Sequence, residues 1–260
     1  MTTSPRMPPD EALLMGSMLE RFLSSIGDGV VLVGGQALNF WMEWFNIDAE
    51  GMVVSTDGDL LGELVDAQAL AAALAADIIL PPKMARTSLV AQLRLRVDGG
   101  RVVNIDVLHK LYTVGGLKKS GEFTRRVAAN SIRAKVGGDR VIRVMDPFDL
   151  LEARVQNAVG LFAEKGPHVV TQARWAIEVA GEALIALASN EGEASGRLGQ
   201  RLQYLYAFAR SSPGRRLWSE RGLDVLNAVR LDELLAISPS HERQLQAIDL
   251  EQQRRRADQP

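Results

Sequence analysis

Hydrophobic residues in the first part of the chain switch between helical and strand spacing. Leu14, Met18 and Phe22 recur at helical intervals, and Gly27-Asp28-Gly29 follows them as a stop signal. The pattern as a whole predicts, in order, a helix over 11–25, a buried strand over 30–33, a buried amphipathic helix over 36–45, an extended segment over 52–61 and a helix over 66–76.

A β-hairpin is the clearest local prediction. Residues 89–97 alternate between apolar and polar side chains, and Asp98-Gly99-Gly100 is a typical turn sequence. The apolar stretch over 101–108 supplies the second strand of an antiparallel pair. Residues 140–144 predict one further strand.

Beyond Asp146-Pro147 the pattern becomes purely helical. Asp146 suits a helix cap and Pro147 suits the first helical turn. Helical spacing then predicts helices over 148–163, 169–188, 197–210 and 223–237. We therefore expect an α+β domain over 1–145 and a helical domain over 146–260, with a polar tail from Glu251 that frays.

Composition limits the class of protein. The chain has 260 residues, of which 47% are hydrophobic, and no cysteine, which excludes disulfides and thiolate-bound metals. No apolar stretch approaches the ~20 residues of a membrane span, and residues 1–10 lack the apolar core of a secretion signal. A soluble cytoplasmic protein with no membrane partner is expected.

Charge is distributed unevenly along the chain, although the net charge is only −2. Residues 41–82 contain eight acidic residues and no Lys or Arg, whereas residues 110–143 contain nine basic residues and two acidic ones. An acidic block that could gather cations thus precedes a basic block that could receive phosphates. Ordinary solvated surfaces are the alternative for both blocks.

Three acidic residues form the candidate chemistry. Asp57 and Asp59 are two apart, so an extended backbone would point both to one face, and a neighbouring strand could add Asp106. Three such carboxylates repel one another unless cations neutralise them, and Mg²⁺ prefers oxygen ligands that it shares with substrate phosphates. A site for two Mg²⁺ ions is the resulting prediction.

A glycine pair precedes these carboxylates. Gly34-Gly35 lies between the strand over 30–33 and the helix over 36–45, where backbone N–H groups at a helix N-terminus can receive an anion. Triphosphate oxygens would suit this position, and the Ser55 hydroxyl could add a contact. Gly34, Gly35 and Ser55 are therefore the predicted nucleotide-binding residues.

In this order, the residues resemble the nucleotidyltransferase superfamily of DNA polymerase beta, and within it the AbiEii-type nucleotidyltransferase toxins. The segment VLVGGQALNFW is similar to the family's leading segment, and Ser55-Thr56-Asp57-Gly58-Asp59 stands for its T-x-D-x-D segment. Ser55 replaces the family's Thr, and Val53 replaces an Arg. Leu150-Leu151-Glu152-Ala153-Arg154 loosely matches its L-x-x-E-K segment.

The resemblance implies a nucleotidyltransferase fold with a mixed sheet and a helical C-terminal region. It also implies transfer of a nucleotide from a nucleoside triphosphate to an RNA (tRNA) or protein acceptor. Asp57 and Asp59 would bind Mg²⁺, and Asp106 would hold the catalytic metal and assist deprotonation of the attacking hydroxyl. A toxin role, with a cognate antitoxin as partner, is part of what the resemblance implies.

Several alternatives stay open at the level of sequence. Asp57-Gly58 is also a hairpin-turn dipeptide, which would place both aspartates in solvent. Gly115-Gly116-Leu117-Lys118-Lys119 could be a phosphate-facing loop or a flexible exposed turn. In function, the alternatives are a catalytically silent binding module of the same fold and an enzyme that modifies a small molecule such as an aminoglycoside.

Overall fold

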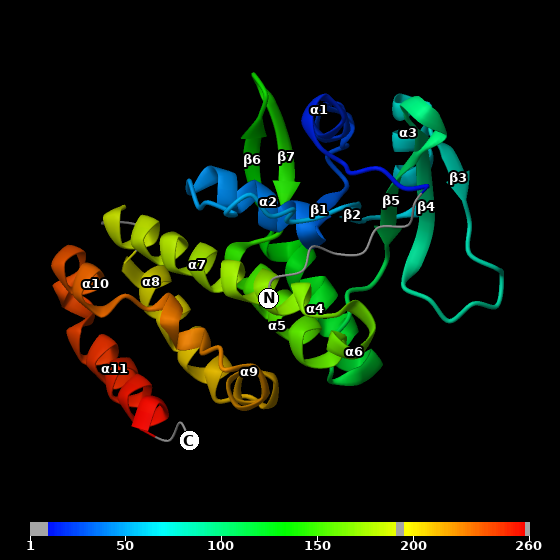
Figure 1. Cartoon of the computed structure of the whole chain (residues 1–260). Coiled ribbons are helices and arrows are strands. Elements are labelled where there is room, and N and C mark those ends of the chain that lie inside the picture. The colour runs from blue at the N-terminus through cyan, green and yellow to red at the C-terminus, as the bar shows by residue number, and fades with distance from the viewer. Residues whose placement is uncertain (1–9, 191–194, 258–260) are drawn as a thin grey trace.

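A seven-stranded mixed sheet organises the first half of the chain in the computed structural model, which describes residues 10–190 and 195–257 (Figure 1). Its strands are β1 (Val31–Val33), β2 (Gly58–Leu61), β3 (Asp77–Ile79), β4 (Leu89–Arg96), β5 (Val102–Leu108), β6 (Ile132–Val136) and β7 (Arg140–Val144). The spatial order is β3-β4-β5-β2-β1-β7-β6. β2 pairs with β5, and β1 with β7, in parallel, whereas the other pairs are antiparallel.

Four helices accompany the sheet: α1 (Gly16–Ser25), α2 (Gly34–Trp44), α3 (Leu64–Leu74) and α4 (Gly116–Asn130). α2 begins directly at the end of β1 and packs on β1 and β2. Its Trp41 donates a hydrogen bond from Nε1 to the Met145 carbonyl at 2.8 Å. This bond fixes α2 to the end of β7, so the helix that starts at Gly34 is held firmly over the sheet.

The second half of the described chain is helical. It contains α5 (Pro147–Gly160), α6 (Phe162–Lys165), α7 (His168–Ser189), α8 (Ser195–Ala209), α9 (Ser212–Arg221), α10 (Leu231–Ile237), α11 (Glu242–Ala257) and two short 3₁₀ turns, Val225–Ala228 and Pro239–His241. α7 packs against α2, α5, α8 and α10 (Figure 1). The buried apolar residues of both halves form one continuous core. The fold is thus α+β, with a mixed sheet followed by a helical region.

The helix cap predicted at Asp146-Pro147, where the purely helical part of the chain begins, is confirmed. The Asp146 carboxylate accepts hydrogen bonds from the backbone N–H groups of Phe148 (2.9 Å) and Asp149 (3.4 Å), and Pro147 occupies the first turn of α5. Because the missing N–H of proline is not needed in a first turn, this pair starts a helix without leaving a donor unpaired. The predicted hairpin of β4 and β5 is also present.

Several predicted boundaries are wrong. The first helix starts at Gly16 rather than residue 11, because Glu11 bridges to Val102 at the sheet and Leu14 donates to the Thr56 carbonyl at 3.0 Å. The segment 52–61 is regular strand only from Gly58 onward. The helix predicted over 223–237 is a 3₁₀ turn followed by the short α10.

The polar end of the chain is more ordered than its composition indicated. α11 continues to Ala257, and Arg255 pairs there with Asp224 at 3.0 Å and with Glu251 at 3.2 Å. The prediction of fraying from Glu251 is therefore wrong through Ala257, while residues 258–260 and residues 1–9 lie outside the described part of the chain. None of the described helices combines the length and the apolar character that crossing a bilayer requires.

Candidate active site

Strand pairing brings Asp59 and Asp106 side by side. The two residues are direct partners in the parallel pair of β2 and β5. Adjacent strands lie about 4.8 Å apart, and paired residues point to the same face. Burial alternates along β5, with Val103, Ile105 and Val107 buried and Asp106 half-buried on the opposite face. The two aspartates therefore share the more open face of the sheet.

The pair belongs to a row of side chains that crosses four strands. Gln92 on β4 is the register partner of Asp106, and its Nε2 donates to Asp106 Oδ1 at 3.0 Å. On the other side, Val33 on β1 is the partner of Asp59. The row thus runs from Gln92 to the last residue before α2, so Asp59 lies next to the N-terminus of that helix and Asp106 lies one strand further away.

Asp57 lies just before this row rather than in it. It occupies a bend that precedes β2, so the predicted strand geometry for Asp57 is wrong. Its position is instead fixed by the Ser55 hydroxyl, which lies 3.2 Å from Asp57 Oδ1 and 3.1 Å from the Asp57 carbonyl. Its charge nevertheless reaches the row, because it raises the pKa of both Asp59 and Asp106.

The glycine pair accommodates side chains of the site itself. Gly34 has a φ of +70°, and a Cβ added there would lie 1.9 Å from Asp59 Oδ2. A Cβ added at Gly35 would lie 2.3 Å from the Ser55 hydroxyl oxygen. The structure thus gives the glycines a role that sequence reasoning missed: they leave the space in which Asp59 and Ser55 pack at the start of α2.

A cavity of about 270 Å³ opens beside these residues, and both carboxylates and cationic groups line it. Gly34, Asp59 and Asp106 contribute to its lining. The basic contributors are Lys110 after β5, Arg154 on α5 and Lys165 on α6. Of the three, Lys165 was not singled out by its sequence context, because only the packing of α6 carries it to the sheet.

Arg154 is held by a relay of hydrogen bonds. It is only 8% exposed, and its Nη1 donates to Gln172 Oε1 at 3.1 Å. Gln172 Nε2 in turn donates to the Val54 carbonyl at 2.8 Å. Within the described residues, Arg154 Nε is buried without a hydrogen-bond partner. A cation with an unused buried donor therefore lines the same cavity as the carboxylates.

Electrostatics sets the protonation of the site. Burial is the largest cause that raises the pKa of Asp59, to about 7, followed by the charge of Asp57, with Arg154 opposing and Asp106 adding a smaller increase. Burial also raises the pKa of Asp106, and the Gln92 hydrogen bond opposes that increase. The charged carboxylates are thus undercompensated by the protein, which is the condition under which a divalent cation binds favourably.

The oxygen donors suit Mg²⁺ in kind and number. Within the described part of the chain, however, no three Asp, Glu or His side chains already surround one metal position. Repulsion among carboxylates opposes such convergence as long as no cation offsets it. Asp57, Asp59 and Asp106 are therefore neighbours whose final arrangement as ligands stays a prediction.

The basic block of residues 110–143 does not form one free surface. Arg126 pairs with Asp149 at 2.8 Å and with Glu152 at 2.6 Å. Arg140 and Arg143 donate to the backbone carbonyls of Ile26 and Ala128. At least three of the nine basic side chains are thus used in ion pairs or hydrogen bonds within the protein. The segment predicted as a loop at 115–119 forms the cap and first turn of α4.

Removal of the relay should loosen Arg154. We expect Gln172→Leu to cost about 2 kcal/mol of unfolding free energy, because it leaves Arg154 Nη1 and the Val54 carbonyl buried without this partner. Urea unfolding measures this cost. Gln203→Leu, at an exposed glutamine of α8, is the matched control and should change little. Equal effects of the two substitutions would contradict the relay.

The sequence matches no protein-family model and no curated protein. Among solved structures, the chain is similar to an antigenic nucleotidyltransferase-like protein from Paracoccidioides brasiliensis. The two share 14% sequence identity over 75% of this chain and 88% of that chain, with a TM-score of 0.37.

Proposed function

We propose that this protein transfers a nucleotide from a nucleoside triphosphate to an RNA or protein acceptor. The observation that supports the proposal most directly is the register pairing of Asp59 with Asp106, with Gly34 leaving room for the Asp59 carboxylate. Two neighbouring strands and a strand-to-helix turn thus converge on one group of acidic oxygens. The cationic side chains of Arg154 and Lys165 line the same cavity as these oxygens.

In the proposed reaction, an acceptor hydroxyl attacks the α-phosphorus of the triphosphate. The new P–O bond forms as the bond between the α-phosphorus and the bridging oxygen breaks, and pyrophosphate leaves with the electron pair. Asp57, Asp59 and Asp106 would hold Mg²⁺, which when bound neutralises phosphate charge and polarises the reacting phosphoryl group. Asp106, which lines the same cavity, would also accept the proton of the attacking hydroxyl.

The basic side chains of the cavity have a separate proposed role. Arg154 and Lys165 would bind the phosphates and stabilise the charge that develops on pyrophosphate. A guanidinium suits this role because it presents several donors in one plane to phosphate oxygens. Arg154 is also held in place by Gln172, so it would not lose much conformational freedom on binding.

The test supplies each labelled nucleoside triphosphate in turn, with Mg²⁺ and with total RNA or total protein as acceptor. We expect one acceptor class to become labelled and pyrophosphate to appear in equal amount. Asp57→Ala combined with Asp59→Ala should abolish both signals, whereas Asp139→Ala, at an exposed aspartate of the β6–β7 turn, should not. Mg²⁺-dependent binding of the triphosphate without pyrophosphate would instead show a silent binding module.

A toxin role follows from the same proposal and has its own test. Expression of the wild-type chain should arrest growth of a bacterial host, and the Asp57→Ala, Asp59→Ala double variant should not. If the wild-type protein labels an acceptor in vitro but does not affect growth, the transferase activity is supported and the toxin role is contradicted. Resistance to an aminoglycoside would identify a small-molecule acceptor.

A further inference from the structure

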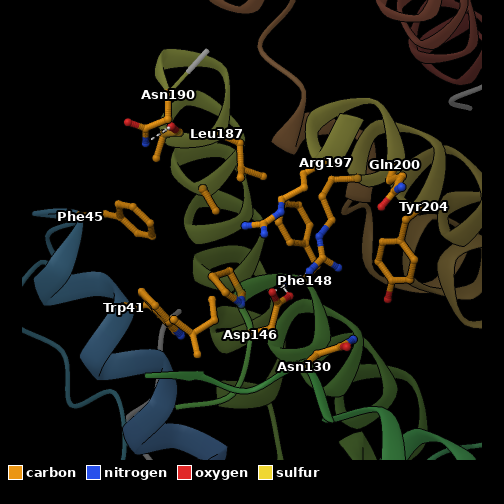
Figure 2. Close-up of a pocket in the computed structure, with 15 residues that line it drawn as sticks. Trp41, Phe45, Asn130, Asp146, Phe148, Leu187, Asn190, Arg197, Gln200 and Tyr204 are labelled. Carbon is orange, nitrogen blue, oxygen red and sulfur yellow. Dashed lines mark hydrogen bonds and ion pairs between the residues drawn. The ribbon is translucent and has the colours of Figure 1, made fainter. Parts of the chain in front are cut away.

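A second and larger cavity lies on the other side of the junction between β7 and α5. Its volume is about 650 Å³, and it is lined mainly by residues of α2, α7, α8 and the N-terminus of α5 (Figure 2). Met145 lines the carboxylate cavity, whereas the next residue, Asp146, lines this one, and the two cavities share no lining residue. The larger cavity is thus separate from the candidate active site, and its size falls within the ~300–1,000 Å³ of small-molecule pockets.

Aromatic rings form much of its wall. Trp41 and Phe45 stack on each other along α2 with ring centres 5.8 Å apart and planes at 22°. Phe148 on α5 and Leu187 on α7 add further apolar surface. Figure 2 shows Trp41 and Phe45 on one side of the cavity, with Gln200 and Tyr204 on the opposite side. A flat apolar group would find a complementary surface here.

The charged residues of the lining leave a positive excess. Asp146 is compensated by Arg201 at 2.7 Å, and it also caps α5. The Arg201 guanidinium lies over the Phe148 ring, 4.7 Å from its centre. Arg197 is the other charged side chain of the lining, and it has no ion pair or hydrogen bond to any residue that the structure describes.

The placement of Arg197 makes its charge available to the cavity. Its side chain extends from α8 toward the middle of the cavity (Figure 2). Two neutral amides also line the cavity, those of Gln200 on the same helix and of Asn190. Asn190 donates a hydrogen bond from Nδ2 to the Ala186 carbonyl, so its side-chain oxygen is left as an acceptor. The cavity therefore combines a cation, polar amides and an aromatic wall.

We propose that this cavity binds a small organic anion with a flat aromatic body, of the size and chemistry of a nucleoside monophosphate. The aromatic ring packs against the wall formed by Trp41 and Phe45. The anionic group pairs with Arg197, and Gln200 and Asn190 offer hydrogen bonds to the ring edge. Binding in this cavity does not depend on the proposed transferase activity.

Calorimetric titration with adenosine 5′-monophosphate tests the proposal on the full chain, in a chelator and without Mg²⁺. Wild-type protein should bind this probe at least about tenfold more tightly than adenosine or inorganic phosphate, because each of these lacks one half of the recognition. Arg197→Ala should weaken binding by about tenfold or more. Ala186→Phe, which fills the cavity without changing charge, should abolish it.

Two control variants show whether the probe occupies this cavity. Arg215→Ala removes an exposed guanidinium from α9, outside the cavity lining, and should leave binding unchanged. The Asp57→Ala, Asp59→Ala variant should also bind the probe normally. Thermal unfolding of each variant confirms that it is folded.

Three results would overturn the proposal. The first is undetectable binding to the wild-type protein. The second is binding that inorganic phosphate reproduces. The third is binding that survives both Arg197→Ala and Ala186→Phe but disappears in the Asp57→Ala, Asp59→Ala variant, which would place the probe in the candidate active site and leave the transferase proposal standing.

Discussion

Asp59→Asn should reduce nucleotidyl transfer by about a hundredfold to a thousandfold, the range expected when one preorganised electrostatic group of an active site is lost. Asn keeps the shape of the side chain that packs against Gly34 but removes its charge. Under the proposed function, the charge is what holds Mg²⁺ between Asp57 and Asp106. Steady-state rates with the labelled acceptor measure the loss.

The same substitution should make the metal-free protein more stable at pH 8. The folded-state pKa of Asp59 is about 7, against an ordinary value of 3.8. Between these values the native carboxyl keeps a proton that the unfolded chain has lost, so native stability falls as the pH rises from about 4 to about 7 and stays low above 7. Each pH unit in this window costs about 1.4 kcal/mol, so the roughly three units between the two pKa values give a total on the order of 4 kcal/mol.

Urea unfolding at pH 5 and pH 8 in a chelator checks both the sign and the size. The wild-type protein should lose stability between these pH values, and Asp59→Asn should lose much less. Asp139→Asn, at an exposed aspartate, should follow the wild-type curve. If Asp59→Asn is no more stable than wild type at pH 8, burial does not disfavour the Asp59 charge. Mg²⁺ should stabilise the wild type and leave the variant unchanged.

Gly34→Ala should cost about 2–4 kcal/mol of unfolding free energy and reduce transfer in parallel. Its added Cβ would overlap Asp59, at 1.9 Å from Oδ2 and 2.5 Å from Cβ. Neither side can move easily, because Val33 and Asp59 are register partners in the sheet. A left-handed φ of +70° adds strain for any residue with a Cβ. Overpacking of this kind typically costs about 1–3 kcal/mol beyond the backbone strain.

Gly116→Ala is the matched control, because it measures only the cost of placing a residue with a Cβ in the left-handed backbone conformation. Gly116 has a φ of +81°, and a Cβ there would meet nothing within 4 Å. We expect a loss of about 1 kcal/mol, with transfer unchanged. Equal losses at the two positions would mean that Asp59 does not press against Gly34. A larger loss at Gly34 that is relieved in Gly34→Ala combined with Asp59→Ala would confirm the contact.

Local sequence predicts the elements whose own residues create the signal. The alternation along β4 and β5 and the intervening turn predict the hairpin, since each strand buries one face. Asp146-Pro147 marks the start of α5 in an equally local way, because the Asp146 carboxylate caps the helix and Pro147 suits its first turn. By contrast, the local pattern does not predict α4, and of the hairpin of β6 and β7 it predicts only the second strand, because these segments are polar and rich in charge. These segments form regular structure because they pack on the rest of the protein, not because of the intrinsic propensity of their residues.

The candidate site shows the same division at the level of side chains. By itself, the sequence determined the class of chemistry: acidic oxygens at Asp57, Asp59 and Asp106, and a glycine pair before them. Tertiary structure alone decided that β2 pairs with β5 in the register that joins Asp59 to Asp106, and that α5 and α6 carry Arg154 and Lys165 to the same cavity. Register and helix docking depend on contacts between segments far apart in the chain, so no local pattern encodes them.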